Sequence, residues 1–229
     1  MKTLGSVIFF GRANCIYSKN IKKYLKKNSR KFYYIESHKP NEKHNIQKFE
    51  KLHLDYIFCF RSFYILKKNL IEKCNIAAIN FHPGTPKYRG IGCINFALYN
   101  DEKIYGCTSH LINKNLDNGK ILDVRKFKIL KNDTVYTALR KTYSLMALQA
   151  FSIIKLLLRD KKNLNTLINK NKKIKWSKRI TKRSDLNKLY LVKKEITQKK
   201  LSKIIRATNT DLYKPYIYLH KKKFILSEE

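Results

Sequence analysis

The most constraining feature of the sequence is a short apolar run, residues 76–79, followed directly by Asn-Phe-His-Pro at 80–83. A run of this length predicts a buried strand. Because side chains alternate along a strand, Asn80 and His82 should lie on the same side of it. In open α/β sheets, ligands bind at the carboxyl ends of the strands. The sequence therefore indicates an α/β sheet with a polar site where this strand ends.

Short β-rich runs alternate with segments of helical spacing along most of the chain. We expect strands at residues 7–10, 31–36, 56–60, 77–81, 105–112 and 120–129. We expect helices at 18–25, with Ser18 as the N-cap, and at 67–74, 93–99 and 134–158, while the polar stretch 39–51 should be loop or helix. This alternation predicts a mainly parallel sheet flanked by helices, so the fold class is α/β and Rossmann-like.

The character of the chain changes after residue 160. Residues 161–175 are rich in Lys and Asn and predict a linker or an exposed hairpin. A helix should follow at 197–207, and two apolar runs at 216–219 and 224–226 predict a β-hairpin around a polar turn. We therefore divide the chain into a main domain, residues 1–160, and a small C-terminal extension, residues 161–229.

The chain is strongly basic, with a formal net charge of +35. Such a charge can mark a nucleic-acid surface. Here the lysines are spread along most of the chain and occur with abundant Asn and Ile, which indicates the codon bias of an AT-rich genome. We therefore expect no nucleic-acid partner, although a positive field would attract an anionic substrate such as a nucleotide diphosphate.

Several other kinds of site and segment are not indicated. The five cysteines include no C-x-x-C pair, and zinc-ligand spacing is absent, so we expect no disulfide framework and no metal. Gly11 stands alone, without a glycine-rich phosphate loop. The longest apolar stretch, 145–158, is interrupted by Gln149 and Lys155, so we expect no membrane-spanning helix. A reducing cytoplasm fits these features.

Three polar side chains carry the groups that acyl transfer to an amine requires. The reaction passes through a tetrahedral oxyanion, so it needs a hydrogen-bond donor for that oxygen and a base for the amine proton. Asn80 offers an amide that does not titrate, His82 can polarise a carbonyl or shuttle a proton, and Asp117 can orient the histidine. The chain between Asn80 and Asp117 is long enough to fold back beside the first strand. Gly119 allows a tight loop there.

Four segments together match a known pattern: NFHP at 80–83, PKYRG at 86–90, GCTSH at 106–110 and DNGKI at 117–121. They resemble the folate-dependent formyltransferase family, and the resemblance covers roughly residues 5–145. It implies the formyltransferase fold and an enzyme that transfers a formyl group from N10-formyltetrahydrofolate to an amine, without a metal. It also implies that Asn80, His82 and Asp117 are the catalytic residues.

The same resemblance implies residues for each ligand. The segment from Phe63 to Leu66 is similar to the one that lines the pterin pocket, and the loop from Asn113 to Asp117 should close over the pterin ring. The cofactor-binding residues are then Phe63, Ile65, Leu66, Asn113, Leu116 and Gly119. The substrate-binding residues are Arg89, Gly90, Thr108, His110 and Tyr216.

Several of these residues also have a purely structural interpretation. Arg89 could contact an anionic ligand or fix its loop, and His110 could line a pocket or simply pack. Tyr216 could stack on a nucleotide base or belong to the hairpin core. Cys93 should be a packing residue, although near the pocket it is also a weak nucleophile candidate.

Within the family, the sequence looks most like the nucleotide-sugar N-formyltransferases. The similarity rests on the short HPGTP form at 82–86, on NFALY at 95–99 and on the C-terminal hairpin. It implies a nucleotide-linked 4-amino-4,6-dideoxy sugar of the perosamine type as substrate, used for a surface glycan such as O-antigen, and a homodimer. Three alternatives stay open: formylation of methionyl-tRNA, formylation of glycinamide ribonucleotide, and a degenerate RNA-binding member of the fold.

Overall fold

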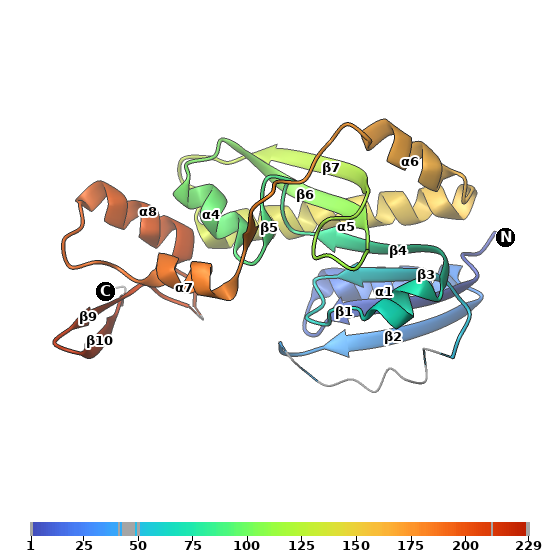
Figure 1. Ribbon diagram of the computed structural model, residues 1–229, viewed down its shortest axis with the longest axis horizontal. Helices are drawn as coiled ribbons and strands as arrows, with labels where there is room; N and C mark the ends of the chain where they lie inside the picture. The colour runs from blue at the N-terminus through green and yellow to red at the C-terminus, as the bar shows by residue number, and fades with distance from the viewer. Residues whose placement is uncertain (1, 41, 43–48, 50, 212, 228–229) are drawn as a thin grey trace.

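The computed structural model of the chain describes residues 2–40, 42, 49, 51–211 and 213–227 (Figure 1). The stretch predicted as loop or helix at 39–51 therefore lies largely outside the described residues.

The central sheet has six strands in the order β2-β1-β3-β4-β6-β7. They are β1 (Ser6–Arg12), β2 (Lys31–Ser37), β3 (Leu54–Phe60), β4 (Cys74–His82), β6 (Ile104–Leu111) and β7 (Ile121–Lys128). The strands β1 to β4 pair in parallel, whereas β6 and β7 run antiparallel to their neighbours. The prediction of a mainly parallel α/β sheet is confirmed.

Helices cover both faces of this sheet. They are α1 (Ile16–Asn28), α3 (Lys68–Glu72), α4 (Cys93–Tyr99), α5 (Val135–Arg159) and α6 (Asn163–Asn171). Two further helices, α7 (Arg183–Tyr190) and α8 (Gln198–Thr208), belong to the C-terminal part, where α8 packs against α4. Val7 and Phe9 of β1 pack in one core with α1, α5 and α6, whereas Ile8 and Phe10 pack in a second core that contains Leu70 of α3. Because strand side chains alternate between faces, β1 must be apolar throughout, as its sequence is.

Two predicted helix ends were wrong. Helix α1 begins at Ile16 with Cys15 in the N-cap position. Ser18 lies inside the helix, where its Oγ accepts a hydrogen bond from the backbone N–H of Arg12 at 3.2 Å. The helix predicted at 67–74 is shorter because the chain enters β4 at Cys74.

The prediction of a linker or exposed hairpin at 161–175 was also wrong, because most of this segment forms α6. Leu164, Leu167 and Ile168 recur at the i, i+3 and i+4 spacing that places them on one helix face. Leu164 is buried in the main core, and the other two pack against it. The surrounding lysines and asparagines obscured this apolar stripe in the sequence. The boundary at residue 160 stays a prediction.

The C-terminal part ends in the predicted β-hairpin, β9 (Tyr216–Leu219) and β10 (Lys222–Ile225). His220 and Lys221 form its turn, both with positive φ (46° and 64°), as a two-residue type I′ turn requires. In Figure 1 the hairpin lies at the end of the molecule away from β1 and β2. Closer to the sheet, β8 (Ile180–Thr181) pairs with β5 (Arg89–Gly90) and ties this C-terminal part to the loop after β4.

Candidate active site

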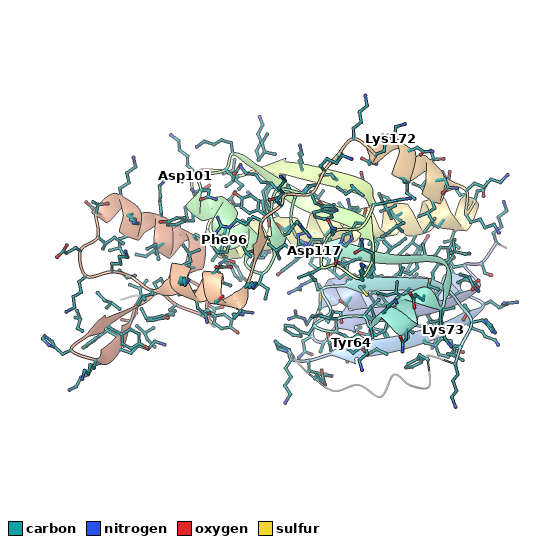
Figure 2. All side chains as sticks on the ribbon, in the orientation of Figure 1. Tyr64, Lys73, Phe96, Asp101, Asp117 and Lys172 are labelled. Atoms are coloured by element: carbon teal, nitrogen blue, oxygen red, sulfur yellow. The ribbon has the colours of Figure 1, made fainter. Side chains whose placement is uncertain are left out.

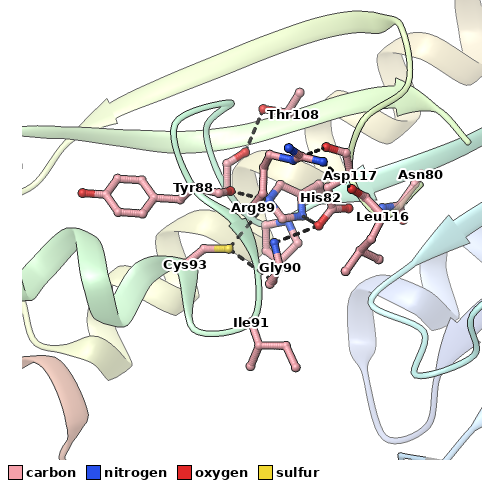
Figure 3. Close-up of polar contacts among 12 residues, drawn as sticks. Asn80, His82, Tyr88, Arg89, Gly90, Ile91, Cys93, Thr108, Leu116 and Asp117 are labelled. Carbon is pink, nitrogen blue, oxygen red and sulfur yellow. Dashed lines mark hydrogen bonds and ion pairs between the residues drawn. The ribbon is translucent and has the colours of Figure 1, made fainter. Parts of the chain in front are cut away.

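The end of β4 brings the predicted trio together (Figure 3). His82 Nδ1 lies 3.3 Å from Asp117 Oδ2. Asn80 pairs with His110 across the antiparallel register of β4 and β6, and its amide nitrogen lies 3.2 Å from His110 Nε2. His110 Nε2 in turn lies 3.5 Å from Asp117 Oδ1. The structure therefore brings Asn80, His82 and Asp117 together and adds His110 to them.

The charged groups of this cluster are buried, so they shift the pKa values of one another strongly. Figure 2 shows Asp117 in the middle of the molecule, where its side chain is 6% exposed, and that of His82 is 4% exposed. Burial, the largest single effect, lowers the pKa of His82, but the Asp117 carboxylate, Cys93 and the Tyr88 carbonyl together outweigh it and raise the pKa to about 9. Burial raises the pKa of Asp117, but His82 and His110 together hold it well below its usual range. At neutral pH the two groups therefore form a buried imidazolium–carboxylate pair.

Both ring nitrogens of His82 have acceptors within the protein. Nδ1–H points to Asp117, and Nε2–H donates to the Tyr88 carbonyl oxygen at 2.8 Å. Cys93 Sγ lies 3.7 Å from the same Nε2 and donates to the Gly90 carbonyl oxygen. These contacts fix the orientation of the imidazole, with Nδ1 facing the Asp117 carboxylate and Nε2 facing the Tyr88 carbonyl.

Arg89 holds the loop that carries Asp117. Its guanidinium donates to the carbonyl oxygens of Leu116 (2.9 Å), Asp117 (2.8 Å) and Ser177 (2.7 Å). The Gly90 backbone N–H donates to Asp117 Oδ2 at 3.0 Å. Arg89 is only 6% exposed, and its hydrogen bonds go to backbone carbonyl oxygens. Of the two roles that the sequence left open, ligand contact and fixing the loop, these contacts correspond to fixing the loop.

A cavity of about 270 Å³ opens beside the trio, and we call it the loop cavity. Its lining includes Asn80, His110 and Asp117, and four of the residues predicted to bind the cofactor: Ile65, Leu66, Asn113 and Leu116. Phe63 and Gly119 lie outside this lining. The Phe63 ring stacks under the Arg12 guanidinium at 3.2 Å. Gly119 packs so tightly that a Cβ would meet the Leu111 carbonyl oxygen at 1.7 Å, so only glycine fits there.

A second cavity of about 500 Å³, which we call the arginine cavity, lies on the other side of the loop after β4. Pro83, Gly90 and Cys93 contribute to its wall, so it borders the trio. Its remaining polar lining is rich in arginine and tyrosine: Arg61, Arg140, Arg183, Tyr136, Tyr143, Tyr190 and Tyr213. None of these arginines forms an ion pair with a carboxylate in the described part of the chain.

The residues predicted to bind substrate are distributed over several places. Gly90 lines the arginine cavity, and His110 lines the loop cavity. Thr108 is fully buried and donates to the Gly84 carbonyl oxygen at 2.7 Å. Tyr216 lies in β9 against Tyr218 and belongs to neither lining, although it packs against a cluster that includes Tyr190 of the arginine cavity. Of the five residues predicted to bind substrate, only Gly90 both lines the arginine cavity and contacts the trio, through its hydrogen bond to Asp117.

Sequence reasoning missed two residues of the site. Arg61 directly follows β3 with a positive φ of 55°, and its guanidinium stacks over the Tyr143 ring at 3.6 Å. A cation at the carboxyl end of a predicted strand was the available signal. Trp176 packs against His82 and His110. It directly follows the segment 161–175 predicted as a linker or exposed hairpin, and no local pattern marked it as a site residue.

A sequence profile described as formyl transferase matches residues 10–150, more than half of the chain. The chain belongs to the formyl transferase family. Methionyl-tRNA formyltransferase from Borrelia garinii is 36% identical over 86 residues, which is 37% of this chain and 27% of that protein. The matches to the first curated relatives span 14% to 31% of their length.

Solved structures with the same fold cover nearly all of this formyl transferase. A 4-N formyltransferase from Francisella tularensis aligns with a TM-score of 0.74 at 18% identity, over 98% of this chain and 97% of that one. An N-formyltransferase from Helicobacter canadensis, solved with folinic acid and dTDP-3-aminofucose, aligns with a TM-score of 0.67 at 21% identity, over 94% and 84%. At these identities the likeness establishes the fold.

Two further properties hold for the described residues. They contain no group of three or more His, Cys, Asp or Glu side chains arranged to hold a metal ion. None of the helices they form is both long enough and apolar enough to cross a membrane.

Proposed function

We propose that this formyl transferase moves the formyl group of N10-formyltetrahydrofolate to the amine of a nucleotide-linked amino-dideoxy sugar. The observation that carries the proposal is that Asn80 and Asp117 line the loop cavity, while Gly90, whose backbone N–H donates to Asp117, lines the arginine cavity. The loop cavity suits a pterin, and the arginine cavity suits an anionic carrier. The Helicobacter canadensis enzyme, solved with a folate and a dTDP-sugar, supports the pairing of these two ligand classes.

The lining of the loop cavity fits a pterin ring. Leu66 and Ile65 offer apolar contacts, and the Asn113 and Asn115 amides offer donors and acceptors at the rim. Bound there, the folate supplies the formyl carbon and departs as tetrahydrofolate. Asn80 and Asp117 lie in the same lining, so the catalytic side chains are within reach of a ligand in this cavity.

The side chains divide the chemistry among them. The amine attacks the formyl carbon, and the carbonyl oxygen takes up the negative charge. Asn80 donates an amide N–H to that oxygen. The Asp117 carboxylate accepts the proton that the amine loses, directly or through water, and this proton passes to N10 as the bond between N10 and the formyl carbon breaks. The imidazolium charge of His82 stabilises the anion that forms nearby. Its Nδ1–H keeps Asp117 in place, while its Nε2–H donates to the Tyr88 carbonyl oxygen.

The arginine cavity fits a diphosphate carrier. Guanidinium groups bind phosphate oxygens with two parallel hydrogen bonds, and none of Arg61, Arg140 and Arg183 is neutralised by a described carboxylate. Tyrosine rings offer flat surfaces on which a base can stack. The net charge of +35 attracts such a ligand over a longer range.

The second candidate substrate is methionyl-tRNA, because several curated relatives with 33–36% identity are methionyl-tRNA formyltransferases. The same trio would serve that amine. The test is to incubate the protein with N10-formyltetrahydrofolate and either dTDP-, UDP- and GDP-linked 4-amino-4,6-dideoxy sugars or methionyl-tRNA, and to measure product mass.

Formylation of one sugar, absent with the Asp117→Asn variant, is the expected result. Formylation of methionyl-tRNA alone would replace the sugar proposal with the second candidate. Salt-dependent RNA binding without any formyl transfer would favour the degenerate RNA-binding member of the fold.

We further propose that the hairpin pairs two copies of the chain. Tyr218, Phe224 and Ile225 are 49%, 51% and 59% exposed, although all three are large and apolar. An isolated two-stranded hairpin is marginally stable in water and normally needs a covering surface. A second copy would provide that surface and make the enzyme a homodimer.

A further inference from the structure

Trp176, the single tryptophan of the chain, reaches the catalytic cluster from outside the main sheet. It lies between α6 and β8, in the segment that Figure 1 shows running from α6 past the sheet to α7. Its ring centroid lies 5.8 Å from that of His82 and 5.0 Å from that of His110, with the planes nearly perpendicular (73° and 84°). One half-buried indole therefore contacts both histidines of the site.

The polar edge of Trp176 fixes the catalytic loop. Its Nε1–H donates to the Gly119 carbonyl oxygen at 2.8 Å, two residues after Asp117. The next residue, Ser177, accepts a hydrogen bond from Arg89, which also holds the carbonyl oxygens of Leu116 and Asp117. Trp176 and Ser177 therefore both support the Asp117 loop: Trp176 bonds directly to Gly119, and Ser177 bonds to the Arg89 guanidinium that holds Leu116 and Asp117.

We propose that Trp176 is a positioning residue for formyl transfer, which holds the Asp117 loop and the two imidazoles in their reactive arrangement. The inference rests on the proposed function for the identity of the reaction, and on the contacts of Trp176 for the positioning role. It assigns a catalytic contribution to a segment beyond residue 160.

The physical reasons are direct. The indole N–H is a donor only, so it matches a backbone carbonyl without competing for the Asp117 carboxylate. Its apolar faces keep water from the buried ion pair, and charges interact more strongly where water is excluded. The titratable and charged groups near Trp176 include His82 from β4, His110 from β6 and Asp117 from the loop, and Arg89 from β5 donates to the Asp117 carbonyl oxygen.

The kinetic test compares Trp176→Phe and Trp176→Ala with Lys178→Ala, an exposed neighbour in the same segment. Phe keeps an aromatic ring but loses the hydrogen bond, so kcat should fall about fivefold. Ala frees the loop, and kcat should fall about a hundredfold. KM for both substrates should change little, because the linings of the two cavities do not include Trp176. An unchanged kcat in both variants would overturn the proposal.

A spectroscopic test needs no substrate and so separates this proposal from the proposed function. A protonated imidazole quenches tryptophan emission. The Asp117 carboxylate, together with Cys93 and the Tyr88 carbonyl, raises the pKa of His82 to about 9 against the effect of burial. Emission of the unmodified protein should therefore rise as the pH passes about 9, and His82→Gln should abolish that step. If the same step persists in His82→Gln, or if emission does not depend on pH, Trp176 does not sense the catalytic histidine and the proposal fails.

Discussion

Replacing His82 by glutamine should make the stability of the protein less dependent on pH in the alkaline range. Asp117 raises the pKa of His82 from 6.5 to about 9 on folding, against the opposing effect of burial. A group whose pKa is raised in the folded state stabilises that state fully below its unfolded pKa, and this contribution is lost as the pH rises through the folded pKa. The window is therefore about pH 6.5 to 9.

The magnitude follows from the same two values. Each pH unit between 6.5 and about 9 costs about 1.4 kcal/mol of unfolding free energy, because only the folded state then holds the proton. The natural protein should therefore lose about 3 kcal/mol across the window, and the variant should not. Both ring nitrogens of His82 have partners, Asp117 and the Tyr88 carbonyl oxygen, and the side chain is 4% exposed. Solvent therefore screens the ion pair only weakly.

The assay is urea unfolding of both proteins at closely spaced pH values under reducing conditions. Other titrating groups, including the five cysteines, are common to both proteins and cancel in the difference. His53→Gln, which removes an exposed imidazole, controls for the loss of a histidine as such. A difference between natural protein and His82→Gln that stays constant across the window would refute the buried ion pair.

Four further outcomes test the rest of the site. Asp117→Asn should lower kcat about a thousandfold while folate still binds, measured by steady-state kinetics and calorimetry; near-normal turnover would remove Asp117 from the mechanism. Leu66→Trp should fill the loop cavity and raise KM for the formyl folate about tenfold or more, with the KM of the amine substrate unchanged as its internal control. Arg183→Ala should weaken binding of a nucleoside diphosphate about tenfold by calorimetry, whereas equal affinity would place the carrier elsewhere. Phe224→Glu should convert a dimer to a monomer in light scattering after size exclusion, and a protein that is monomeric before the change would contradict the hairpin interface.

The proximity of Asn80, His82 and Asp117 could be predicted because each of them has a local signature. The strand that ends in Asn80 and His82 is an unbroken apolar run, and strand alternation puts the two side chains on one face. Asp117 follows in a loop that its glycine marks as tight. The partnership of Asn80 with His110 could not be predicted, because it depends on the antiparallel register of β4 and β6, and a single sequence does not specify register between distant strands.

The roles of individual polar residues were harder to predict than their location. Arg89 was predicted to bind substrate and contacts the Asp117 loop, but a sequence cannot distinguish a guanidinium that binds a ligand from one that binds carbonyl oxygens of a neighbouring loop. Thr108 has the same ambiguity, and its hydroxyl donates to Gly84. Trp176 carried no signal at all, because its partners are a backbone carbonyl and two rings that only the tertiary fold brings close.

The basic charge of the chain divides into two populations with different physical roles. Every described lysine is exposed or half-buried, which fits the interpretation that most of them reflect codon bias. Several arginines instead have specific partners: Arg12 stacks over Phe63, Arg61 over Tyr143, and Arg89 fastens the Asp117 loop. A planar guanidinium can stack and donate in two directions at once, and an ammonium group cannot. These arginines are therefore fixed by the fold at defined positions, whereas the lysines add a positive charge that is spread over the surface.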